Sequence, residues 1–135
     1  MADTPALRVV VVTPERAELD TPAEFVVLPL FDGERGIQRG HSAFVGQLGA
    51  GELRITTGTE TKRYFVDAGF VQVAGNVVNV LTAKAVPADK VTADAATTAR
   101  AAADALPGVT TVERETRAKA VARAQGLAAV ARRNG

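Results

Sequence analysis

Hydrophobic and polar positions alternate in short runs over the first part of the chain, a pattern typical of β-strands. The expected strands cover residues 7–12, 24–28, 52–57, 61–73 and 76–81. The second should end at Pro29, and Leu53 and Ile55 should share one face of the third. One face of the fourth should carry Tyr64, Val66, Ala68 and Phe70. Short strands separated by glycine-containing turns predict an antiparallel β-sandwich, or flattened barrel.

The last third of the chain has a helical pattern that is interrupted once. We expect a first helix over residues 89–106 with Asp89 as N-cap, and a break at 106–108. Thr110 and Glu113 fit a capping box that opens a second helix, which should run to Arg133. Its apolar stripe consists of Ala120, Val121, Ala124, Leu127, Ala128 and Ala131. The fold class is therefore β + α, with an N-terminal antiparallel β-sandwich followed by a C-terminal antiparallel α-helical hairpin.

A change in composition near Pro87 divides the chain into two units. Residues 1–87 carry 8 Lys and Arg against 10 Asp and Glu, whereas residues 88–135 carry 8 against 5 and contain 16 alanines. We expect a sandwich domain over 1–87 and an Ala-rich regulatory hairpin over 88–135. Alanine buries little apolar area, and Gly126 should cost the second helix about 1 kcal/mol. These features fit a mobile arm that is held lightly, and they also fit a GC-rich genome, in which alanine is simply common.

The overall composition excludes several classes of function. The net charge is only +1, aromatic residues make up 4% and there is no Trp, so a nucleic-acid binder is not expected. The chain has no Cys and a single His, His41, which excludes thiol chemistry and multi-His metal sites. There is no phosphate-binding P-loop, and residues 46–51 fit a loop better than a dinucleotide fingerprint. Glu24 and Asp67 are expected to be isolated carboxylates, solvated or paired locally.

The chain shows no sign of a membrane span or of an export signal. Residues 1–5 have neither a basic nor an apolar region, and no apolar run approaches the length that a bilayer requires. An intracellular protein is expected.

A series of phrases along the chain resembles one known family. They are Phe25–Pro29, Asp32–Ile37, Gly40–Ala43, Leu48–Ile55, Phe65–Val73 and Asn76–Thr82. In order and spacing they resemble the epsilon subunits of bacterial F-type ATP synthases, whose mitochondrial equivalent is called delta. The phrases cover residues 7–83, and the remainder agrees in layout. The family's Ile-Leu-Pro-x-His is replaced here by Ile37-Gln38-Arg39-Gly40-His41, so this loop should be less rigid.

The resemblance implies a non-catalytic subunit of the central rotor stalk. The implied partners are the gamma subunit, the polar loops of the membrane c-ring, and the catalytic beta and alpha subunits, which the C-terminal helix would reach. The implied place is peripheral, on the cytoplasmic side of the bacterial membrane. The subunit would couple ion-driven rotation to ATP synthesis, and its hairpin would be able to inhibit ATP hydrolysis.

Residues 32–41 form a polar, glycine-containing segment that is expected to be a loop presenting a binding surface. The residues that match the family's contacts with gamma and the c-ring are Glu34, Gly36, Ile37, Gly40 and His41. Arg35 and Arg39 would meet acidic or polar groups on the ring loops. An ordinary hairpin loop with a solvated histidine is the alternative interpretation.

The second helix is basic, with a net charge of +4 from Val112 onward. A solvated helix face would explain this charge. The resemblance implies instead that Arg114, Arg117, Lys119 and Arg123 contact an acidic segment of the beta subunit. No cofactor is expected, because the phrase Ile-Asp-x-x-Arg-Ala, through which some family members bind ATP, is not matched at residues 87–96.

A second function class remains open from the sequence. The chain would also fit a free-standing β-sandwich adaptor whose basic helical arm binds an acidic protein or nucleic acid.

Overall fold

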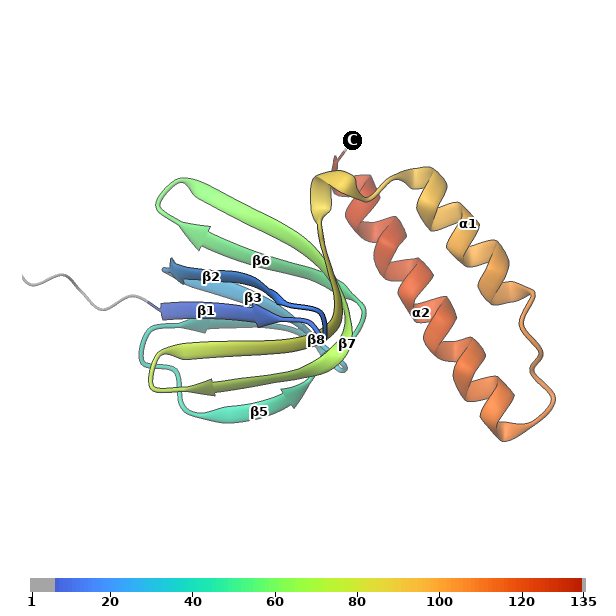
Figure 1. Ribbon diagram of the computed structural model, residues 1–135, viewed down its shortest axis with the longest axis horizontal. Coiled ribbons are helices and arrows are strands. Elements are labelled where there is room, and N and C mark those ends of the chain that lie inside the picture. The colour runs from blue at the N-terminus through green and yellow to red at the C-terminus, as the bar shows by residue number, and fades with distance from the viewer. Residues whose placement is uncertain (1–6, 135) are drawn as a thin grey trace, which may run out of the picture.

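The computed structural model describes residues 7–134 and consists of a β-sandwich with a helical hairpin along one side (Figure 1). The strands are β1 Leu7–Val12, β2 Ala17–Ala23, β3 Phe25–Leu30, β4 Gly33–Gln38, β5 Phe44–Gln47, β6 Gly51–Thr57, β7 Glu60–Ala74 and β8 Val77–Pro87. They are followed by a 3₁₀ turn, η1 Ala88–Lys90, and by the helices α1 Ala93–Asp104 and α2 Thr111–Asn134. The expected absence of an export signal at residues 1–5 lies outside the described residues.

The strands pair in the order β2-β1-β8-β7-β6-β3-β4. The long strand β7 pairs with β8 from Tyr64 to Ala74, with β6 over its first half and with β5 over its second half, so the sheet folds over on itself. The pairing of β1 with β8 is parallel, and the other strand pairings are antiparallel. The predicted fold class is confirmed, and β1 beside β8 adds a parallel pair that alternation within single strands could not show.

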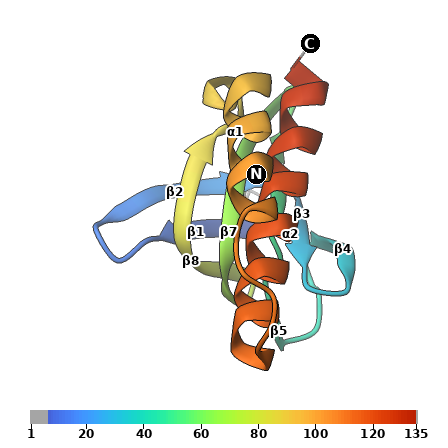
Figure 2. The same ribbon diagram turned by 90° about the vertical axis from the view of Figure 1, so that its right-hand side faces the viewer.

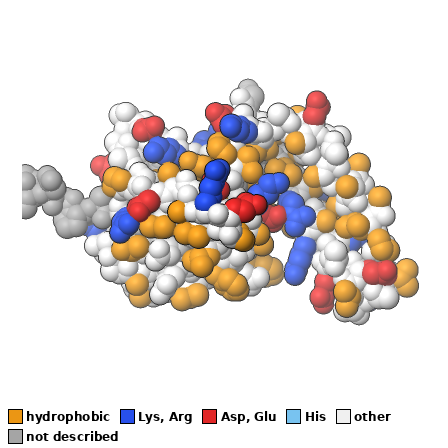
Figure 3. Space-filling view, viewed as in Figure 1, with side chains coloured by type: hydrophobic (Ala, Val, Ile, Leu, Met, Phe, Trp, Pro, Cys, Tyr) orange, Lys and Arg blue, Asp and Glu red, His pale blue; other side chains and the backbone are white. Residues whose placement is uncertain are grey.

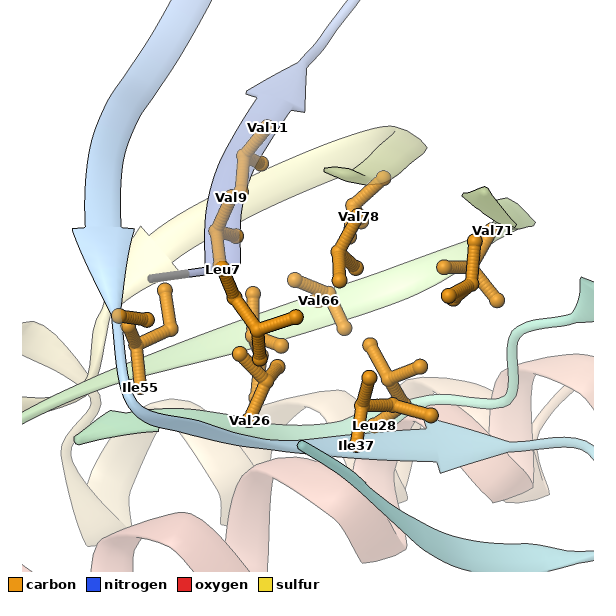
Figure 4. Packing of buried hydrophobic residues seen from close by; sticks show 14 of the residues in the cluster. Leu7, Val9, Val11, Val26, Leu28, Ile37, Ile55, Val66, Val71 and Val78 are labelled. Atoms are coloured by element: carbon orange, nitrogen blue, oxygen red, sulfur yellow. The ribbon is translucent and has the colours of Figure 1, made fainter. Parts of the chain in front are cut away.

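The sandwich core is made of the inward faces of these strands (Figure 4). In β1, Leu7, Val9 and Val11 are buried while the residues between them are more exposed, which is the two-residue period of a strand. Leu53 and Ile55 are buried in β6, as the alternation predicted. Aliphatic side chains from the strands of both layers thus make up most of the sandwich core.

The prediction that a strand ends at Pro29 is wrong, because β3 continues to Leu30. β3 pairs with β6 only over its first three residues. Pro29 lies beyond this pairing, so the N–H that proline lacks would have no partner on β6. The carbonyl of Pro29 is still used, since it accepts a hydrogen bond from the backbone N–H of Gly49. The largely polar strand β2 and the short strand β5 were not predicted, because neither has a strong hydrophobic alternation.

The prediction of one face for Tyr64, Val66, Ala68 and Phe70 is also wrong beyond Val66. Ala68 and Gly69 have positive φ values of 62° and 117°, which turn the strand over. After this point Val71 and Val73 are buried, and Phe70 is 59% exposed.

The helices begin and end close to the predicted residues, but one cap differs. The predicted N-cap Asp89 lies in η1, and the observed N-cap of α1 is Thr92, whose hydroxyl accepts from the N–H of Ala95. The capping box of α2 is confirmed: the Glu113 N–H donates to the Thr110 hydroxyl at 3.0 Å, and the Thr110 N–H donates to the Glu113 carboxylate at 2.9 Å. The hydrogen bond from the Thr110 N–H also lowers the pKa of Glu113.

The two helices form an antiparallel hairpin whose second helix, α2, contacts β6 and β7 and lies between the sandwich and α1 (Figure 1). A second apolar cluster joins them to the sandwich through Phe65 of β7, Ala88 and Val91 near η1, and Val130 of α2. None of the helices over residues 7–134 is long and apolar enough to span a bilayer.

Candidate interaction sites

The segment expected to be a loop at residues 32–41 is mostly a strand. Gly33–Gln38 forms β4, which pairs with β3 and is an edge strand of the sheet. Ile37 explains why this segment is a strand and not a loop. Its side chain is fully buried in the sandwich, and the residue pairs with Val26 of β3. We therefore assign Ile37 to the core and not to an exposed interface. Glu34, Arg35 and Arg39 are exposed.

Arg35 and His41 share one aromatic neighbour, Phe44 of β5. The Arg35 guanidinium carbon is 4.9 Å from the Phe44 ring centre, and the His41 and Phe44 ring centres are 5.4 Å apart. A guanidinium at this distance is attracted to the face of the ring. His41 also contacts the Ser42 carbonyl through Nδ1 at 2.7 Å. The basic groups at this edge are therefore held in place by β5.

Two of the three glycines of this segment, Gly36 and Gly40, have local structural roles. A side-chain carbon on Gly36 would lie 2.6 Å from the ring of Phe25, so glycine lets that ring cover the strand. The N–H of Gly40 donates to the side-chain oxygen of Asn76 at 2.8 Å, which ties the segment to the β7–β8 turn.

A groove of about 670 Å³ lies beside β4, between the β3–β4 turn and β5. Its lining includes Phe31 and Val45, which are 75% and 71% exposed. Hydrophobic side chains also gather on the surface of the sandwich around β5 (Figure 3). Large apolar side chains at this exposure beside charged groups are typical of a protein-binding surface.

The four basic residues of α2 that were predicted to contact another subunit differ in their contacts within this chain. Arg114 donates to the Val109 carbonyl at 2.6 Å, and Arg117 donates to the Asp104 carbonyl at 3.4 Å, so both tie the connection between the helices. Lys119 forms no ion pair with the described residues. Arg123 turns the other way and forms an ion pair with Asp67 of β7.

Glu52 is the centre of a charged cluster that the sequence did not reveal. Its side chain is 5% exposed and accepts hydrogen bonds from Arg63 at 2.7 Å, Arg54 at 3.2 Å and Arg133 at 2.6 Å. Burial opposes the ionisation of Glu52, but the hydrogen bonds from Arg63, Arg54 and Arg133 together outweigh it and hold the pKa of the carboxyl below its ordinary value. Arg54 also reaches Glu34 at 3.1 Å, which links the cluster to β4.

Asn134 completes the cluster at the end of α2. Its side-chain oxygen accepts from Arg63 at 2.8 Å, and its side-chain nitrogen donates to the Ala88 carbonyl at 2.5 Å. Charged side chains accordingly gather along the line where the sandwich meets the hairpin (Figure 3).

The expectation that Asp67 is solvated or paired locally is wrong. Asp67 is nearly buried, and its partner Arg123 lies 56 residues away. The carboxylate of Glu24 accepts from the Gly58 N–H at 2.8 Å, also far along the chain. An acidic residue within an apolar strand was the available signal, but its partner could not be identified before the docking of α2 was known. Over residues 7–134, no group of three or more His, Cys, Asp or Glu side chains could hold a metal ion.

Comparison with known proteins gives a consistent result. The model of the beta-sandwich domain of the ATP synthase delta/epsilon chain matches residues 6–88. The ATP synthase epsilon chain of Rhodopirellula baltica is 50% identical over 121 residues, which cover 90% of this chain and 94% of that protein. The epsilon chain of Desulfitobacterium hafniense is 38% identical over 104 residues, with 77% of each chain covered.

Solved structures agree with this fold over nearly the whole chain. A chain of the Euglena gracilis mitochondrial ATP synthase, from a structure of OSCP, F1 and c-ring, matches 96% of this chain and 83% of its own length, with a TM-score of 0.76 and 24% identity. A chain of the central stalk and c-ring structure of the Tetrahymena thermophila mitochondrial ATP synthase matches 96% and 99%, with a TM-score of 0.72 and 15% identity.

These findings define a β-sandwich protein with a C-terminal helical hairpin of the delta/epsilon type. The chain belongs to the ATP synthase delta/epsilon chain family. The resemblance read from its sequence is thereby confirmed.

Proposed function

We propose that this chain is a non-catalytic subunit of the central rotor stalk of an F-type ATP synthase. The observation that carries the proposal is the match to an ATP synthase epsilon chain at 50% identity over 90% of the chain, which includes both the sandwich and the hairpin. The subunit couples rotation of the c-ring to ATP synthesis through the gamma subunit. It is peripheral to the membrane, on its cytoplasmic side.

Within this proposal, residues 1–87 bind the rotor and residues 88–135 regulate it. The exposed charges of β4 and the segment after it meet gamma and the polar loops of the c-ring. These residues are Glu34, Arg35, Arg39 and His41, with Gly36 and Gly40 shaping the backbone. The groove beside β4 supports an interface at this edge, because it offers the exposed apolar side chains of Phe31 and Val45 next to the charges.

Reversing the charges at this edge tests the rotor contact. The pair Arg35→Glu and Arg39→Glu is expected to reduce co-purification of the gamma subunit about tenfold, because complementary charges fix the docking of two surfaces. Arg16→Glu is the control for a charge reversal elsewhere on the sandwich: Arg16 is 74% exposed, and it follows β1 in the hairpin on the opposite side of the sandwich from β4 (Figure 2). Equal recovery of gamma with the pair and with the control would count against the interface.

The hairpin is proposed to slow ATP hydrolysis by contact with the catalytic alpha and beta subunits. The side chains proposed for this contact are Arg114, Arg117, Lys119 and Arg123. We expect the complex without residues 88–135 to hydrolyse ATP severalfold faster than the complete one, and we expect the difference to shrink as salt is raised, because salt screens exposed charges beyond about 8 Å at physiological strength. ATPase rates at two salt concentrations measure this. Equal rates with and without the hairpin would show that it exerts no braking effect here.

A further inference from the structure

Glu34 of β4, one of the residues proposed to meet the rotor, is held by an arginine two strands away. The Arg54 guanidinium donates to both oxygens of the Glu34 carboxylate, at 3.1 Å and 3.4 Å. Arg54 lies on β6, and Val27 of β3 pairs with Arg54 on one side and with Gly36 of β4 on the other. The ion pair therefore spans three neighbouring strands and ties the edge strand β4 to an inner strand of the sheet.

Arg54 is itself fixed by the carboxylate of Glu52. Nη1 of Arg54 lies 3.2 Å from this carboxylate, and the Glu52 side chain is only 5% exposed. Glu52 also accepts a hydrogen bond from Arg63 at 2.7 Å, so its own position does not depend on Arg54. The exposed fraction of the side chain rises to 25% at Arg54 and to 49% at Glu34. These contacts thus run from a covered part of the sheet out to the solvent.

The carboxylate of Glu34 can still bind a partner while Arg54 holds it. An ionised carboxylate offers about four lone-pair positions, and the two hydrogen bonds from Arg54 leave the others free. These positions can accept hydrogen bonds from N–H groups of a docking protein. Arg35, the next residue of β4, does not compete for them, because it is held separately with its guanidinium carbon 4.9 Å from the centre of the Phe44 ring.

Holding Glu34 in place before binding reduces the free energy that docking requires. A glutamate side chain that moves freely loses rotamer freedom when an interface immobilises it, and this loss weakens binding. Because the ion pair with Arg54 already restricts the side chain in the free protein, less freedom is lost on docking. Removal of Arg54 should therefore weaken binding even if Arg54 does not touch the partner.

We propose that Arg54, fixed by Glu52, is a positioning residue that holds the carboxylate of Glu34 ready to accept hydrogen bonds from the rotor. This inference rests on the proposed function, in which Glu34 contacts the rotor. It adds to that function a side chain of β6, which lies outside the segment 32–41.

A double-mutant cycle on the full-length chain tests this role. The measured quantity is the dissociation constant of each variant for the synthase complex from which this subunit has been removed. Arg54→Gln is expected to weaken binding about fivefold, because Glu34 then has to be immobilised on docking. In a chain that already carries Glu34→Gln, the same change should alter the dissociation constant by less than about twofold. A general loss of structure would instead weaken binding equally in both backgrounds.

The matched control is another ion pair between strands, formed by Arg8 of β1 and Asp20 of β2. Arg8 also donates to both oxygens of its partner, at 2.8 Å and 2.6 Å, but β1 and β2 lie at the other end of the strand order from β4. Arg8→Gln removes the same charge from the sandwich and should change the dissociation constant by less than about twofold.

The positioning role is overturned if Arg54→Gln has the same effect with and without Glu34, or if it weakens binding no more than Arg8→Gln does. It is also overturned if Glu34→Gln binds as tightly as the unaltered chain, because Arg54 then positions nothing for the rotor. In each of these cases the unaltered chain still rebinds the complex, so the proposed place in the stalk stands. If the unaltered chain does not rebind, the proposed function is rejected and the positioning role with it.

Discussion

The variant Gly69→Ala is expected to lower the free energy of unfolding by about 3–5 kcal/mol. Gly69 has a φ of 117°, a conformation in which alanine is strained. The added carbon would also overlap the carbonyl oxygen of Leu81 and lie 2.9 Å from its carbonyl carbon. These atoms belong to the backbone of the neighbouring strand β8, so they cannot rotate away. Either β7 and β8 separate locally or the strand loses its reversal.

Urea unfolding followed by circular dichroism measures this loss. Gly58→Ala is the matched control, because Gly58 also has a positive φ, 61°, but has nothing within 4 Å of the added carbon. Strain alone should cost the control about 1 kcal/mol. A difference between the two variants of less than this amount would contradict the close approach of β8 at Gly69.

Features of the fold that depend on neighbouring residues in the chain could be predicted from the sequence. The strand over residues 7–12 has the predicted bounds, and the capping box of Thr110 and Glu113 forms as expected. Both depend on residues next to one another in the chain. The N-cap Thr92 was missed for a related reason, because Asp89 offered an equally good local cap and only the 3₁₀ turn at 88–90 decides between them.

The reversal within β7 could not be predicted by period alone. A two-residue alternation assigns Val66 and Phe70 to one face, and it holds only while the backbone stays extended. Ala68 carries a positive φ although it is not glycine, so its conformation is imposed by the strands around it. β4 was missed for a similar reason, since its single core residue, Ile37, gives no alternation to detect.

The charged cluster around Glu52, where the sandwich meets the hairpin, depends on contacts between distant parts of the chain. Glu52 and Arg133 are separated by 81 residues, and nothing in either neighbourhood identifies the other. The positive charge of α2 was evident from the sequence, but the sequence did not show which neighbours its basic side chains contact. Arg114 and Arg117 serve the hairpin itself, whereas Arg123 faces the sandwich. The three arginines of the proposed contact with another subunit therefore already have partners within this chain, whereas Lys119 forms no ion pair with the described residues.

The variant Gly126→Leu is expected to lift α2 from the sandwich while leaving the sandwich folded. A side-chain carbon on Gly126 would lie 2.8 Å from the carbonyl oxygen of Ala50 and 3.1 Å from the ring of Phe65. Ala50 immediately precedes β6, so its carbonyl is held by the sheet and the helix has to move instead. Overpacking of about 3 kcal/mol would reduce the ratio of docked to open chains about 100-fold.

The chain has no natural cysteine, so Thr59→Cys and Thr98→Cys, both at exposed positions, allow fluorescent labels on the sandwich and on α1. Energy transfer between these labels measures the loss of docking, and circular dichroism reports whether the helices persist. Leucine favours helix over glycine by about 1 kcal/mol, so helical content should be maintained. Ala118→Leu is the control, because Ala118 is exposed on the same helix. From the sequence, Gly126 looked like a defect in α2, whereas the contact with Ala50 makes it the position that allows the helix to dock. Unchanged energy transfer in Gly126→Leu would show that this close contact does not determine docking.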